Sequence, residues 1–160
     1  MKYPSLEVVL TLYQETIART GGLSGLRDLA LLEAALARPQ STFAGKELYP
    51  TLFLKAACLM HSLILNHAFL DGNKRIGVVL AGTMLVMNGY QLEVGRREMV
   101  SFTLSVAEGK RSVEEIAAWL GRTAGRLLCS RDDLAIKINI EFYAEATDAL
   151  LKASCGVNLH

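Results

Sequence analysis

The residues best suited to chemistry in this sequence of 160 residues stand together between His67 and Arg75. His67 opens the segment, and an imidazole can take a proton from an attacking hydroxyl near neutral pH. Asp71 offers a carboxylate, a hard oxygen ligand of the kind that suits Mg²⁺, and Mg²⁺ in proteins commonly shares the phosphates of a substrate. A base and a metal ligand at this spacing predict a reaction at a phosphate group.

The second half of the segment predicts an anion-binding site. Gly72 lets the backbone approach a ligand closely, and Asn73 adds a hydrogen-bond donor. Lys74 and Arg75 add two positive charges. If a helix begins here, its first backbone N–H groups lack partners within the helix and carry partial positive charge. These parts match those needed for phosphoryl transfer, in which positioning and charge neutralisation supply most of the catalysis.

Each residue of the segment also has a simpler explanation. A single histidine after a helix is often structural, Asp-Gly-Asn is by itself a turn signal, and Lys-Arg is by itself a solvated surface. Phe69 is expected to point into the core and to hold the loop rigid. The functional interpretation therefore depends on the order of these residues and on their place between two apolar segments.

Two predicted helices flank the segment and must position it. Residues 52–66 are apolar on nearly every side of a helix, which is typical of a helix in the middle of a fold. A second apolar helix is predicted from about Lys74 to Asn88, where Gly89 ends it. The polar segment would then stand between two central helices. Burying it without partners would be costly, and a bound ligand is one way to satisfy its polar groups.

Helical periodicity extends over most of the chain and predicts an all-α protein, a compact helical bundle. The chain is divided into a main domain over residues 1–125 and a C-terminal extension over residues 126–160, which is predicted to be helical and packed on the same domain. Further helices are expected at 6–17 (ended by Gly21-Gly22), 27–37, 96–108, 113–121 (opened by a capping box from Ser112 to Glu115) and about 130–154, with a loop or short extended segment at 41–50.

Composition restricts the classes of function. The formal net charge is +1, with 17 basic and 16 acidic side chains, which argues against a nucleic-acid partner. The three cysteines are widely spaced and form neither a disulfide framework nor a metal-binding pair. The N-terminus has no signal-peptide pattern, and the longest apolar stretch, residues 76–87, is too short to span a membrane. We therefore expect a cytoplasmic protein with a packed core.

The segment His67-x-Phe69-x-Asp71-Gly72-Asn73-Lys74-Arg75 resembles the signature of the Fic/Doc superfamily, and more closely that of its death-on-curing (Doc) branch. The stretches 21–28 and 32–40 also resemble that branch, and the resemblance covers residues 1 to about 125. It implies a Fic fold in which His67 is the general base and Asp71 is the Mg²⁺ ligand. The residues implied to hold the phosphates of ATP are Gly72, Asn73, Lys74 and Arg75.

The resemblance also implies a toxin of a toxin–antitoxin pair. Such a toxin modifies a hydroxyl group on a target protein, and the expected target is a translation factor. Some relatives carry their own inhibitory helix, marked by Ser or Thr followed four residues later by Glu and then Gly or Asn. Glu108-Gly109 comes nearest to that pattern, but Leu104 stands where the hydroxyl residue belongs. A separate antitoxin protein is therefore the expected partner.

Two positions bear on which group is transferred. Relatives that transfer AMP carry glycine where this chain has Lys74 and a second arginine where it has Val78. Losing that arginine removes a bidentate phosphate clamp, while Lys74 adds a bulky point charge. We expect transfer of a phosphate from ATP. Transfer of AMP and an inactive binding module of the same fold remain the alternatives.

Overall fold

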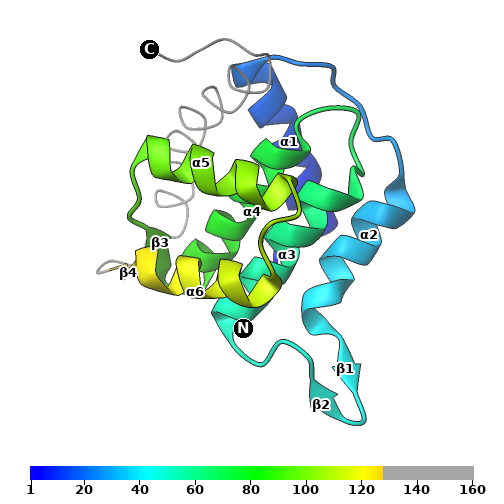
Figure 1. Cartoon of the computed structure of the whole chain (residues 1–160). Helices are drawn as coiled ribbons and strands as arrows, with labels where there is room; N and C mark the ends of the chain where they lie inside the picture. Colours follow the sequence, from blue (N-terminus) through cyan, green and yellow to red (C-terminus); the bar gives the residue numbers. More distant parts are fainter. Residues whose placement is uncertain (128–160) are drawn as a thin grey trace.

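Six α-helices make up most of residues 1–127, the part of the chain that the computed structural model describes (Figure 1). They are α1 (Leu6–Thr20), α2 (Leu29–Ala37), α3 (Leu52–Asn66), α4 (Asn73–Met87), α5 (Arg96–Ala107) and α6 (Val113–Thr123). The predicted all-α class is confirmed. Residues 128–160, which include the helix predicted to reach about residue 154, lie outside the described residues.

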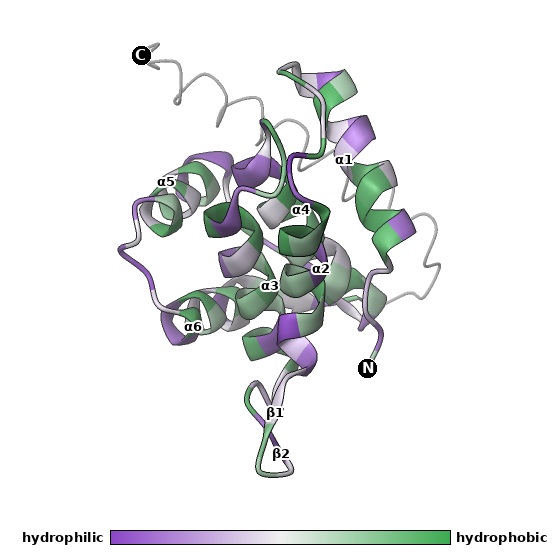
Figure 2. Ribbon diagram, turned by 90° about the vertical axis from the view of Figure 1, so that its right-hand side faces the viewer, coloured by the Kyte–Doolittle hydropathy of each residue, from purple (hydrophilic) through white to green (hydrophobic). Residues whose placement is uncertain are grey.

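Helices α3 and α4 form the centre of the fold. Figure 2 shows their apolar ribbons between α1 on one side and α5 and α6 on the other. Nearly every residue of α4 is buried, so this helix is surrounded by protein along its length. Gly77 of α4 faces Ile64 of α3 so closely that a Cβ atom on Gly77 would lie 2.6 Å from Ile64 Cγ1. The glycine therefore lets the two central helices pack in close contact.

The helix boundaries follow local sequence signals. Four helices are capped by a side-chain oxygen that accepts a backbone N–H of the first turn. These caps are Ser5, Asp28, Thr51 and Ser112. The predicted capping box between Ser112 and Glu115 is present, and Gly21 ends α1 with a φ of 83°. The second helix begins at Leu29 rather than at Arg27 because Asp28 caps it.

A short hairpin and a second two-stranded antiparallel sheet complete the described structure. Strands β1 (Thr42–Phe43) and β2 (Lys46–Glu47) form the extended segment expected in the 41–50 loop, after a 3₁₀ turn at Arg38–Gln40. Strands β3 (Tyr90–Leu92) and β4 (Ala124–Arg126) pair antiparallel and were not predicted. Each has three residues, too few to show alternation, and β4 spans the predicted boundary between residues 125 and 126. No helix within residues 1–127 is long and apolar enough to cross a membrane.

We predict that Gly77→Ala lowers the free energy of unfolding by about 1–3 kcal/mol, because the added methyl group must push Ile64 away in a packed core. Gly121→Ala in α6 is the matched control, since a Cβ atom there would lie 3.8 Å from Phe53, an ordinary contact. Alanine favours a helix over glycine by up to about 1 kcal/mol, so this variant should match or exceed the wild type. Urea denaturation measures both, and equal stability of the two variants would contradict the close packing.

Candidate active site

The loop between α3 and α4 carries the residues singled out in the sequence. His67 ends α3 in the left-handed conformation (φ 51°, ψ 47°), and its side chain is exposed to solvent. A non-glycine residue in this conformation is uncommon, and such residues cluster at functional sites. The predicted base is thus accessible to a second molecule at the point where the chain leaves α3.

Phe69 and Asn73 hold the loop in shape. Phe69 is 2% exposed, and its ring stacks on Tyr13 of α1 with ring centroids 3.9 Å apart. This confirms that Phe69 points into the core. The Asn73 side chain accepts the Phe69 N–H and donates to the Phe69 carbonyl, both at 3.0 Å. The amide of Asn73 therefore closes the loop on itself, and its predicted contact with a phosphate stays a prediction.

Asp71 places a partly exposed carboxylate at the start of α4. Its Oδ1 accepts the N–H of Gly72 at 2.6 Å and lies 3.1 Å from Nη2 of Arg75. The side chain is 41% exposed, so solvent reaches it. Two partners on one oxygen fix the orientation of the carboxylate, as outer-shell partners do for metal ligands.

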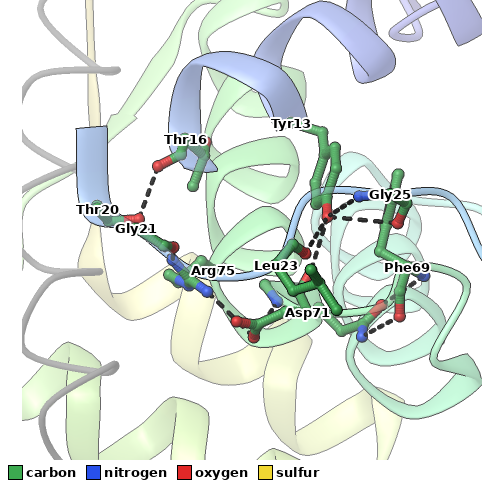
Figure 3. A network of polar contacts seen from close by, with 11 residues as sticks. Tyr13, Thr16, Thr20, Gly21, Leu23, Gly25, Phe69, Asp71 and Arg75 are labelled. Atoms are coloured by element: carbon green, nitrogen blue, oxygen red, sulfur yellow. Dashed lines mark hydrogen bonds and ion pairs between the residues drawn. The ribbon is translucent and has the colours of Figure 1, made fainter. Parts of the chain in front are cut away.

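Arg75 is a buried cation, with its side chain only 3% exposed. Its Nη1 donates to Thr20 Oγ1 and to the carbonyl of Gly21, both at 2.6 Å (Figure 3). Its Nη2 faces Asp71 as an ion pair but makes no hydrogen bond. The sequence predicted a charged group at a ligand site, whereas the structure also makes this guanidinium a link between α1 and the motif loop.

The segment after α1 packs along the motif loop. Leu26 forms an isolated antiparallel bridge with Phe69, and Leu70 donates its N–H to the carbonyl of Gly25 at 2.9 Å. The Tyr13 hydroxyl accepts the N–H of Gly25 at 3.2 Å and donates to the carbonyl of Asp71 at 3.0 Å. The two sequence motifs, far apart in the chain, therefore form one structural unit (Figure 3).

Tyr13 and Thr20 are the site-forming residues that sequence reasoning missed. Tyr13 falls within the helix expected at 6–17, and Thr20 lies between that helix and Gly21-Gly22, but neither was assigned a role. Both are buried on α1, at 3% and 9% exposure. A signal was available in the sequence. Tyr13 and Thr20 are seven positions apart, so they share one face of the helix, and each would bring a hydroxyl group that needs a partner into the core.

The start of α4 is suited to an anion. Gly72 precedes it in the left-handed region (φ 82°, ψ 9°), and the first intrahelical bond runs from the N–H of Ile76 to the carbonyl of Gly72. The N–H groups of residues 73–75 therefore precede the helical hydrogen-bond ladder. Together with Lys74, which is half-buried, they form a positive helix end beside Asp71.

The donor set fits Mg²⁺ delivered with phosphates. Within residues 1–127 no group of three or more His, Cys, Asp or Glu side chains could hold a metal ion by itself. Asp71 is the carboxylate next to the helix end, and Mg²⁺ is commonly held by one or two carboxylates plus substrate phosphates. A metal at this site would thus depend on the bound nucleotide.

His61 lies in a different environment from His67. It is half-buried in α3, and its Nδ1 lies 3.4 Å from Nη1 of Arg38, which also donates to Ser62 Oγ at 2.9 Å. Burial, and then the nearby Arg38 charge, lower the pKa of His61. Its contacts are those of a structural histidine.

In this helical domain, a loop that contains a histidine and a glycine leads into the buried central helix, and this arrangement matches a known family. The chain belongs to the Fic/DOC family, whose family model matches residues 3–85, more than half of the chain. It is 53% identical over 72 residues to the toxin Doc of Mycolicibacterium smegmatis, a match that covers 45% of this chain and 55% of that protein. It is 33% identical over 125 residues to the protein kinase doc of Escherichia phage P1, covering 78% of this chain and 98% of that protein. The match thus spans little more than half the length of the first relative and nearly all of the second.

We predict that Tyr13→Phe lowers the free energy of unfolding by about 1–3 kcal/mol, because the backbone N–H of Gly25 loses its acceptor while the stack on Phe69 is kept. Tyr90→Phe is the control, since its ring packs edge-on against Phe53 at the surface end of the core. That variant should stay within about 0.5 kcal/mol of the wild type. Urea denaturation decides, and a Tyr13→Phe protein as stable as the control would mean that the hydroxyl does not hold the two motifs together.

Proposed function

We propose that this chain is a Doc-like toxin that transfers a phosphate from ATP to a hydroxyl group of a target protein. The observation that carries the proposal is the exposed His67 next to a helix N-terminus that holds a carboxylate and two cations. The names of the two relatives, a toxin and a protein kinase, support the same function.

His67 would act as the general base. As the hydroxyl oxygen of the target bonds to the γ-phosphorus, the imidazole takes the hydroxyl proton. The bond from the γ-phosphorus to the bridging oxygen breaks, and ADP leaves with that electron pair. The αL conformation at the end of α3 keeps the imidazole in solvent, where the hydroxyl of a target protein can reach it.

The start of α4 would hold the nucleotide phosphates. The backbone N–H groups after Gly72, Lys74 and Nη2 of Arg75 supply the donors and positive charge, and Asn73 keeps the loop in shape for them. Mg²⁺, held by Asp71 and the phosphates, would neutralise charge during the transfer. These groups position the γ-phosphate in line with the incoming hydroxyl.

The identity of the transferred group is inferred from positions 74 and 78. Position 78 is a valine, which is 1% exposed and lies in the core. It therefore supplies no second guanidinium for the phosphates. Lys74 stands at the opening of the helix, where it would contact the phosphates. Both features favour transfer of the γ-phosphate, and transfer of AMP is the second candidate.

A separate antitoxin would inhibit the toxin. Leu104 of α5 occupies the position at which an internal inhibitory pattern would need a hydroxyl residue, so residues 104–109 do not supply one. The target protein is proposed to be a translation factor, as the resemblance to the Doc branch implies.

We predict that purified protein, incubated with a cell extract, Mg²⁺ and ATP labelled at the γ-phosphate, labels one protein band. ATP labelled at the α-phosphate should leave that band unlabelled, because the α-phosphorus departs with ADP. Autoradiography and mass spectrometry of the band measure the outcome. Label retained only from the α position would contradict phosphate transfer and establish the AMP alternative.

We predict that His67→Ala lowers the transfer rate by about 10²–10⁴, the range typical of a lost general base, and abolishes growth arrest on expression. His61→Gln is the matched control, because it changes the other described histidine, which lies within α3 and contacts Arg38. That variant should remain toxic. Equal transfer of label by all three proteins would contradict the role of His67 as general base, whereas no transfer by any of them would contradict the enzymatic proposal and favour the binding module.

A further inference from the structure

The last turn of α1 ends directly beside the motif loop, at Thr20 and Gly21. The Thr20 hydroxyl donates its own proton to the carbonyl of Thr16 at 2.6 Å. Its oxygen is therefore left as an acceptor for other groups. The carbonyl of Gly21 lies next to it, beyond the end of the helix, where Gly21 has a φ of 83°.

These two oxygens accept hydrogen bonds from the same nitrogen of Arg75. Nη1 donates to Thr20 Oγ1 and to the Gly21 carbonyl, both at 2.6 Å. The negative end of a helix dipole favours a cation at this place. Because the guanidinium is planar and rigid, two acceptors on one nitrogen fix the direction of the other nitrogen as well.

The other terminal nitrogen of Arg75, Nη2, is a buried donor without a hydrogen-bond acceptor. Among the described residues, Nη2 is the buried side-chain nitrogen or oxygen atom that has no hydrogen-bond partner, although it lies 3.1 Å from Oδ1 of Asp71. Leaving a buried donor unsatisfied is costly, so a group that uses it is expected. A Cβ atom on Gly22 would lie 3.0 Å from Nη2. Glycine at this position thus keeps the space beside Nη2 free of a side chain.

We propose that Thr20 is a positioning residue for nucleotide binding, which holds Arg75 through Nη1 so that Nη2 is directed at a phosphate oxygen of the nucleotide beside Asp71. This role rests on the proposed function. Thr20 acts from outside both sequence motifs and touches no substrate itself. It gives a reason for a hydroxyl residue at the buried end of α1.

The test compares variants that differ in one oxygen atom. Thr20→Val replaces the hydroxyl by a methyl group of similar size. Thr20→Ala removes both the hydroxyl and the methyl group. Thr20→Ser keeps the oxygen. Thr16→Val is the matched control, one helical turn earlier, because the Thr16 hydroxyl is also buried and, within residues 1–127, donates to the carbonyl of Leu12 and does not contact Arg75. Calorimetric titration with ATP and Mg²⁺ gives Kd for each folded protein, and the transfer assay separates KM from kcat.

We expect Thr20→Val and Thr20→Ala to raise Kd and KM about 10-fold, the cost of a misdirected charged hydrogen bond, while Thr20→Ser stays within about twofold of the wild type. Thr16→Val should bind like the wild type even if it is somewhat less stable. A Kd for Thr20→Val equal to that of Thr16→Val would overturn the positioning role and leave the proposed function intact. Failure of the wild type to bind ATP with Mg²⁺ would overturn the proposed function itself, and the role of Thr20 with it.

Discussion

The buried guanidinium of Arg75 is the contact on which the rest of the site depends. It joins the C-terminal end of α1, through Thr20 and Gly21, to Asp71 at the start of α4. A cation at 3% exposure needs partners: here Nη1 donates to a hydroxyl and a carbonyl, while Nη2 faces a carboxylate as an ion pair without a hydrogen bond. The geometry of Asp71 and the direction of Nη2 both follow from this one arrangement.

Two helix ends of opposite polarity meet at this point. The end of α1 presents carbonyl oxygens to a cation, and the beginning of α4 presents N–H groups to an anion. Tyr13 connects them through the core, because its ring stacks on Phe69 and its hydroxyl bridges the backbone of Gly25 and Asp71. The close packing of α3 and α4 at Gly77 fixes the two helices that the loop joins. The loop is therefore held by contacts with both α1 and the central helices.

The central helices and the motif loop were predictable because their signals are local. Residues 52–66 were predicted as a helix with the bounds that the structure has, since Thr51 caps its start and the polar loop ends it. The pairing of β3 with β4 was not predictable, because it depends on backbone hydrogen bonds between segments that are distant in sequence. The burial of Arg75 was also missed: an arginine after a lysine suggests a solvated surface, and only the fold brings Thr20 and Gly21 to it. The same holds for the closing of the loop by Asn73, which sequence reasoning had assigned to a ligand.

The most direct measurement is a crystal structure of the protein with Mg²⁺ and an ATP analogue whose γ-phosphate cannot be transferred. We expect the phosphates at the first turn of α4, the metal on Asp71, and Nη2 of Arg75 within hydrogen-bonding distance of a phosphate oxygen, with His67 facing the γ-phosphorus. Nucleotide bound elsewhere on the protein, or an Arg75 that contacts only Thr20, Gly21 and Asp71 while phosphates lie beyond its reach, would contradict the assignment of this loop as the active site.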